Sequence, residues 1–194
     1  YAPASTTGVT VASTTYHHII FNKTANTFSL TTSGITTDTA NGGGDLTITA
    51  GVLDTVSGSN YPISAGGSWT NNGTFTANSG TVTFTSVSTG ETINPSASSF
   101  NAVTFNGSGG EWSALTNTLT VAGDLTMTAG TLNNTTGTAA ITVNGSVSCG
   151  VTCGTITLDN ASHTFTQNVA TNKNFGTNVA VATNWTFNNL TLTS

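Results

Sequence analysis

The stretch GDLTITAGVL (residues 44–53) returns 79 residues later (123 − 44) as GDLTMTAGTL (123–132), with eight of the ten letters unchanged. In the first copy, Leu46 and Ile48 alternate with threonines, and this period of two predicts a β-strand with one buried face. Threonine and valine favour strands because a branched Cβ packs well on a pleated surface. The repeated letters therefore specify a repeated structural element.

The same alternation recurs along the whole chain, for example in GTVTFTS (80–86), AAITVNG (139–145) and GTITLDN (154–160). Clusters of glycine and asparagine such as NGGG (41–44) and NGSGG (106–110) separate these runs, and they favour tight turns because both residues tolerate positive φ. No run of ten residues combines a helical period with helix caps. The sequence predicts an all-β fold.

A second pattern divides the chain into units. YHHIIF (16–21), FNAVTF (100–105) and FNNLTL (187–192) share an aromatic residue, an aliphatic residue three positions later and a large apolar residue at the end. Their spacings are 84 (100 − 16) and 87 (187 − 100) residues. We predict a single repetitive β domain over residues 1–194, with an N-terminal strand segment (1–15), unit 1 (16–99), unit 2 (100–186) and the start of a third unit (187–194).

Short strands, small turns and evenly spread apolar residues favour a β-solenoid, in which coils stack and each strand pairs in parallel with the coils above and below. Threonines and asparagines at equivalent positions would then form ladders. A unit of about 84 residues is too long for one coil and would contain several. The alternative is a row of β-sandwich modules, one per unit.

The stretches LTVAGDLTMTAGTLNN (119–134) and GGSWTNNGTFTANSGTVTF (66–84), closed by FNAVTF, resemble the Thr/Asn/Gly-rich repeats of large secreted bacterial surface and adhesin-like proteins. The resemblance covers nearly the whole chain. Its motifs are structural, so it implies an extracellular location and a repetitive architecture rather than an activity.

Charged residues are 5% of the chain, with two Lys or Arg residues and a net charge of −5. A typical soluble domain has roughly 25%. Nucleic-acid binding requires basic side chains to neutralise phosphates, so we expect no nucleic-acid partner. No stretch approaches the ~20 apolar residues of a membrane-spanning helix, so we expect no membrane span.

Carboxylates offer little for catalysis. The seven acids are scattered along the sequence and arginine is absent. Enzymes that cleave polysaccharides by hydrolysis or elimination need clustered acids. We therefore expect neither an enzyme nor a cofactor. Asp45 and Asp124 occupy matching places in the two decamers and are the weak candidates for a Ca²⁺ site. No calcium-binding loop pattern accompanies them, which favours turn-forming aspartates that bond their own backbone.

Histidine and cysteine are rare. His17 and His18 are adjacent and should point to opposite faces of a strand, while His163 lies in the other unit, so we expect no metal site. Cys149 and Cys153 stand in SCGVTCG. A disulfide needs Cα atoms within ~7 Å, so the bridge that we predict requires the chain to turn between them. Such a bridge suits an oxidising exterior.

Nine asparagines begin an N-x-S/T sequon, which indicates either glycosylation or chance in a chain rich in both residue types. They are Asn22, Asn72, Asn106, Asn133, Asn134, Asn144, Asn160, Asn184 and Asn189.

The leading functional hypothesis is a structural protein of the cell exterior, a subunit or segment of a filament, surface fibre or adhesin stalk. Residues 9–21 resemble residues 179–192, so the expected partners are copies of the chain stacked head to tail, or flanking repeats of a longer chain. The alternatives are a module that binds surface glycans and, from the recurrent outward threonines, an ice-binding protein.

Overall fold

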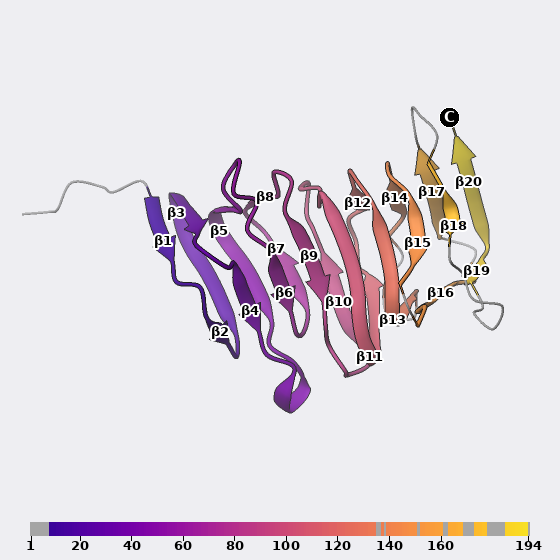
Figure 1. Ribbon diagram of the computed structural model, residues 1–194, viewed down its shortest axis with the longest axis horizontal. Coiled ribbons are helices and arrows are strands. Elements are labelled where there is room, and N and C mark those ends of the chain that lie inside the picture. Colours follow the sequence, from indigo (N-terminus) through magenta and orange to yellow (C-terminus); the bar gives the residue numbers. More distant parts are fainter. Residues whose placement is uncertain are drawn as a thin grey trace, which may run out of the picture.

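The computed structural model describes residues 8–134, 137, 139–150, 152–160, 163–168, 173–177 and 185–193. Its strands stack along one axis as about eight coils of a β-solenoid, from the indigo β1 to the yellow β20 in Figure 1. All pairings between the named strands are parallel, as between β3 (Ile19–Leu30) and β5 (Leu46–Asp54). The predicted all-β solenoid is confirmed, and the sandwich alternative, which needs antiparallel sheets, is wrong.

The chain passes three sides of the solenoid in a fixed order, A, B and C, and each side is a column of parallel strands. Long strands run across the corners: β3 and β5 pass from side C to side A, and β11 (Ala102–Ala114) and β13 (Leu125–Asn133) pass from side B to side C.

Side A contains β1 (Gly8–Val11), the second halves of β3 and β5, β8 (Thr74–Thr76), residues 98–100, β12 (Leu119–Val121), β14 (Ile141–Val143), β17 (Thr164–Asn168) and β20 (Asn189–Thr193). Side B contains β2 (Thr15–Tyr16), β4 (Ile35–Thr37), β6 (Ile63–Ala65), β9 (Thr81–Phe84), the first halves of β11 and β13, β15 (Val147–Cys149) and β18 (Phe175–Thr177). Side C contains the first halves of β3 and β5, β7 (Trp69–Asn71), β10 (Glu91–Asn94), the second halves of β11 and β13, β16 (Thr155–Leu158) and β19 (Trp185–Phe187).

Coil length varies because the corners differ. Partner residues in neighbouring coils are 19 residues apart between Ser64 and Thr83, but 28 apart between Thr36 and Ser64. A turn of 3-10 helix, η1 (Ala40–Gly42), lies within the longer of these two segments. The strands keep their register while the corners absorb the difference.

The two decamers lie on different sides of the solenoid. Leu46–Ile48 of the first copy is on side C, and Leu125–Met127 of the second copy is on side B. From one copy to the other the chain advances eleven sides, one fewer than four complete coils. The same eleven-side advance separates Ile19 on side C, Val103 on side B and Leu190 on side A. Each unit is therefore rotated by one third of a turn relative to the previous one.

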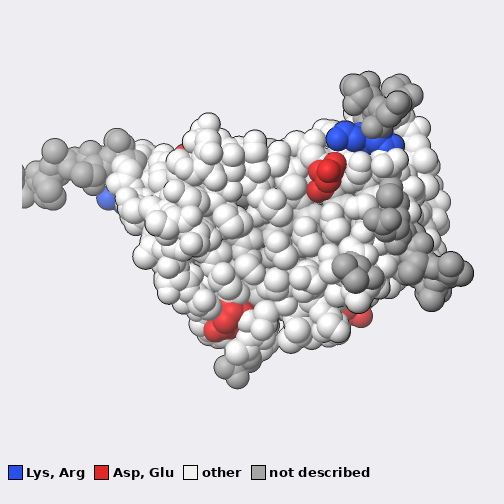
Figure 2. Space-filling view, viewed as in Figure 1, with Lys and Arg blue, Asp and Glu red and all other residues white. Residues whose placement is uncertain are grey.

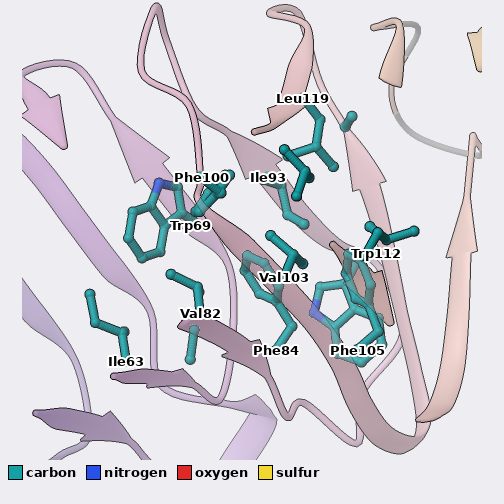
Figure 3. Packing of buried hydrophobic residues seen from close by; sticks show 14 of the residues in the cluster. Ile63, Trp69, Val82, Phe84, Ile93, Phe100, Val103, Phe105, Trp112 and Leu119 are labelled. Atoms are coloured by element: carbon teal, nitrogen blue, oxygen red, sulfur yellow. The ribbon is translucent and has the colours of Figure 1, made fainter. Parts of the chain in front are cut away.

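Alternating side chains point inward and form one continuous core that runs from Val11 to Phe165. In its central coils the core is aromatic, with Phe84 stacked on Phe105 at a centroid distance of 5.2 Å and Phe105 against Trp112 at 5.1 Å. Figure 3 shows these rings packed against one another inside the coils. Burial of this apolar surface is the main force that holds coil to coil.

Outward positions carry hydroxyls in register. On side B, consecutive coils place one hydroxyl residue above the next in an unbroken ladder of Thr15, Thr36, Ser64, Thr83, Thr104, Thr126 and Ser148. A shorter threonine ladder on side A pairs Thr120 with Thr142 and continues through β17 to β20. The expected threonine ladders are present and are not confined to one side. The expected asparagine ladders are not found among the described strand pairs, where Asn71, for example, lies over Ile48 and Asn94 over Thr70.

Candidate functional site

Asp45 and Asp124 are equivalent corner residues in the structure, eleven sides apart along the chain. The Asp45 Oδ1 accepts a hydrogen bond from the backbone N–H of Ser68 at 2.9 Å, and the Asp124 Oδ1 accepts one from the N–H of Ser146 at 2.7 Å. Both serines belong to the next coil. The turn role that we favoured for these aspartates thus takes a different form, because each carboxylate ties its own corner to the corner above it.

The alanine and glycine of each decamer build the next corner. Gly51 and Gly130 have φ of +87° and +81°. A Cβ on Gly130 would lie 2.5 Å from the carbonyl oxygen of Gly107 and 2.9 Å from that of Gly110, both in the coil below. Glycine at this position combines a left-handed backbone with close contact between coils, which explains why both decamers keep it.

The predicted bridge between Cys149 and Cys153 is present, with a Cα–Cα distance of 4.6 Å. Cys153 has a left-handed backbone (φ +52°), which accomplishes the required turn. Counting from the preceding Gly-Ser pair, Cys149 occupies the place that Asn71 holds in unit 1.

In unit 1 the same corner is held by hydrogen bonds. The Asn71 Oδ1 accepts from the N–H of Gly73 at 3.0 Å, and its Nδ2 donates to the carbonyl of Pro95 at 3.0 Å. A fully buried amide and a disulfide are thus alternative ways to fix one corner.

The three histidines do not form one cluster, because only His17 and His18 lie together. His17 and His18 lie in a bend between β2 and β3 with ring centroids 4.2 Å apart, so the prediction that they point to opposite faces is wrong. Strand geometry, on which that prediction relied, does not apply in a bend. The His17 Nδ1 lies 2.9 Å from the Oδ1 of Asp38, and the His18 Nδ1 accepts from the N–H of Asp45 at 3.0 Å.

His163 is buried in unit 2, remote in sequence from that pair. Burial lowers the pKa of its imidazole below 6.5, against the opposing effects of a backbone hydrogen bond with Gly137 and the charge of Asp159. Its buried Nε2 has no hydrogen-bond partner among the described residues.

Glu91 is a buried acid with two serine partners. Its Oε2 accepts from the hydroxyl of Ser68 at 2.6 Å, and its Oε1 accepts from the hydroxyl of Ser86 at 3.0 Å. Glu91 lies on side C one coil above Ser68, and no short sequence motif signals such a contact. The arrangement satisfies a carboxylate inside the wall of the solenoid.

The sequons differ in accessibility. Asn22, Asn72, Asn106, Asn144, Asn160 and Asn189 are exposed, whereas Asn134 is half-buried and Asn133 is buried. The Asn133 Oδ1 accepts from the hydroxyl of Ser113 within the wall. Asn184 lies outside the described residues.

Exposed tryptophan rings would be suited to stacking on sugars, but the tryptophans of this chain are largely buried. Trp69 and Trp112 are fully buried, and Trp185 packs against the end of the core. The large apolar side chains that are exposed are aliphatic: Val9, Ile20, Val87, Leu190 and Leu192.

The open edge of β20 carries two exposed leucines. β20 pairs with β17, and no described strand pairs with its other edge. Leu190 and Leu192 are 42% and 55% exposed, although the equivalent residues of unit 2, Val103 and Phe105, are completely covered. Figure 1 places this strand at the end of the stack.

Charge is sparse over the surface. The face in Figure 2 is almost entirely uncharged, with only a few acidic and basic side chains. Lys173 lies 3.8 Å from Asp124, and both are exposed. Among the described residues there is no group of three or more His, Cys, Asp or Glu side chains that could hold a metal ion.

The described part of the chain also contains no helix long and apolar enough to cross a membrane. No protein family, no curated protein and no solved structure matches this chain. Its function must therefore be inferred from the fold and the surface described above.

Proposed function

We propose that this chain is a structural segment of the cell exterior, part of a fibre or adhesin stalk in which its coils continue end to end with copies of itself or with flanking repeats. The observation that carries the proposal is the continuous core from Val11 to Phe165, which passes through successive coils without a domain boundary. A solenoid of this kind is a rod whose length grows with the number of coils.

The acidic side chains that a catalytic or metal site would use have structural roles in the solenoid instead. Asp45 and Asp124 tie corner to corner, and Glu91 is enclosed by serine hydroxyls. Trp69 and Trp112 are buried, so their rings cannot stack on sugars. Their burial favours a structural role over glycan binding. The distribution of outward hydroxyls over more than one side offers no single flat array for ice.

Two features support an exterior location and end-to-end association. The disulfide between Cys149 and Cys153 suits an oxidising environment. The chain has a net charge of −5 over 194 residues, so electrostatic repulsion between stacked coils is weak, and the apolar edge of β20 favours a further strand.

Immunogold electron microscopy of the cells that make the protein tests the location, with antibodies raised against the folded chain. We expect label along fibres or stalks outside the cell. Label confined to the cell interior, or to globular particles, would contradict the proposal.

Mass per length, measured by scanning transmission electron microscopy, tests the architecture of such fibres. A mass of 19.5 kDa in about eight coils, stacked at ~4.8 Å per coil, gives roughly 5 kDa per nm for a single rod. Values that are not a small multiple of this figure would exclude end-to-end stacking of these coils.

A further inference from the structure

The edge of β20 has two structural equivalents inside the molecule, and both are covered in the same way. Eleven sides before β20 is the first half of β11, and eleven sides before that is the first half of β3. In β3 the strand is covered by Leu46–Ile48, and in β11 it is covered by Leu125–Met127. Both covering strands belong to the repeated decamer.

The hydrogen bonds agree as well. The N–H of Ile19 donates to the carbonyl of Asp45 at 3.0 Å, and the N–H of Val103 donates to the carbonyl of Asp124 at 3.0 Å. Leu190 is the third member of this series, and it is exposed. By equivalence, its N–H points to the open edge, because neighbouring residues of a parallel strand bond to opposite sides.

We infer that the open edge of β20 is a receiving site for a parallel strand of the pattern G-D-L-T-x-T-A-G, supplied by another repeat unit of the same kind joined in tandem. The Asp carbonyl of that strand accepts from the N–H of Leu190, and its two apolar residues cover Leu190 and Leu192. The added unit is rotated by one third of a turn relative to unit 2.

A second copy of the chain is a poorer occupant. Leu46–Ile48 lies between β3 and β7, and Leu125–Met127 lies between β11 and β15, so both edges of each G-D-L-T strand are already paired. A copy could offer only the strands of its first coil. The inference rests on the part of the proposed function in which coils continue end to end, and it does not depend on where the protein is located.

A chimera tests the inference. The chain through Leu192 is extended with a second copy of residues 106–168, the segment that follows FNAVTF in unit 2, so that the added G-D-L-T strand arrives one coil above β20. The control carries Leu125→Thr and Met127→Thr in the added copy alone. These changes keep the loop lengths and use a residue that favours strands, but they remove the inward apolar side chains. The unextended chain is the baseline.

Amide hydrogen exchange, measured residue by residue by NMR, is the readout. We expect the amides of Leu190 and Leu192 to exchange about tenfold more slowly in the extended chain than in the baseline, and to return to the baseline rate in the control. The amide of Thr191, which by alternation faces β17, is the internal reference and should stay protected in all three.

Equal rates in the extended chain and the baseline overturn the inference, and so does equal slowing in the extended chain and the control. Slowing that develops in the unextended chain as its concentration rises identifies a second copy as the occupant, which also overturns it. If the extended chain is protected while immunogold label stays inside the cell, the proposed location fails and the receiving site stands.

Discussion

Replacing Gly130 by alanine tests whether the decamer is repeated for the geometry of its corner. Gly130 has φ +81°, and a Cβ there would lie 2.5 Å from the carbonyl oxygen of Gly107 and 2.6 Å from the Cζ3 of Trp112. The first of these atoms is backbone in the neighbouring coil, and the second belongs to a fully buried ring. Neither can withdraw without moving the wall of the solenoid.

The expected loss of stability has two parts. A left-handed backbone costs alanine about 1 kcal/mol relative to glycine. Overpacking against fixed neighbours costs about 1–3 kcal/mol more. Gly130→Ala should therefore lower the free energy of unfolding by about 2–4 kcal/mol, a large fraction of the stability of a typical domain.

Gly58→Ala is the matched control. Gly58 has a similar φ of +84°, but a Cβ there would meet nothing within 4 Å, so this variant should lose only the backbone part, about 1 kcal/mol. Urea unfolding followed by circular dichroism measures both losses, and amide exchange shows whether the coils on either side of Gly130 loosen first. Equal losses for the two variants would refute the view that close contact between coils fixes this glycine.

Three further outcomes are expected. Burial disfavours the charged imidazole of His163, so below pH 6.5, its ordinary pKa, this residue binds more protons in the unfolded chain than in the folded one. The free energy of unfolding should therefore fall as the pH drops below 6.5. Urea titrations at several pH values should show this fall, and His163→Asn should flatten it. Replacing both Cys149 and Cys153 by serine should cost about 2 kcal/mol, since the bridge closes a short loop, and a reductant should shift the wild type by the same amount while leaving the variant unchanged. In a host that N-glycosylates secreted proteins, mass spectrometry of glycopeptides should find sugar on the exposed Asn106 and none on the buried Asn133; modification of Asn133 would show that this wall opens.

The sequence predicted what depends on local alternation. Leu46 and Ile48 are buried and the threonine between them is not, because a period of two on a strand reports which face is covered. The parallel stacking and the Thr ladders followed from the short strands and repeated letters. The disulfide followed from two isolated cysteines with a turn between them.

The coil period and the contacts between coils could not be predicted. Coil length varies, with 19 residues between Ser64 and Thr83 but 28 between Thr36 and Ser64, and this variation erases any strict period. Without a period, the side on which each unit begins is unknown, and so is the contact between Glu91 and Ser68, which are 23 residues apart. The bend at His17 and His18 was missed because no glycine or proline marks it.

The unequal corners also make this molecule a natural carrier for inserted peptides. Between β5 and β6 the chain makes a turn around Gly58, where the adjacent strands remain paired with the coils on either side. Lengthening a flexible loop costs little, about 0.6 kcal/mol for each doubling. Foreign epitopes or enzyme tags placed at such corners would be displayed at regular intervals along a rigid axis while the interior kept its packing.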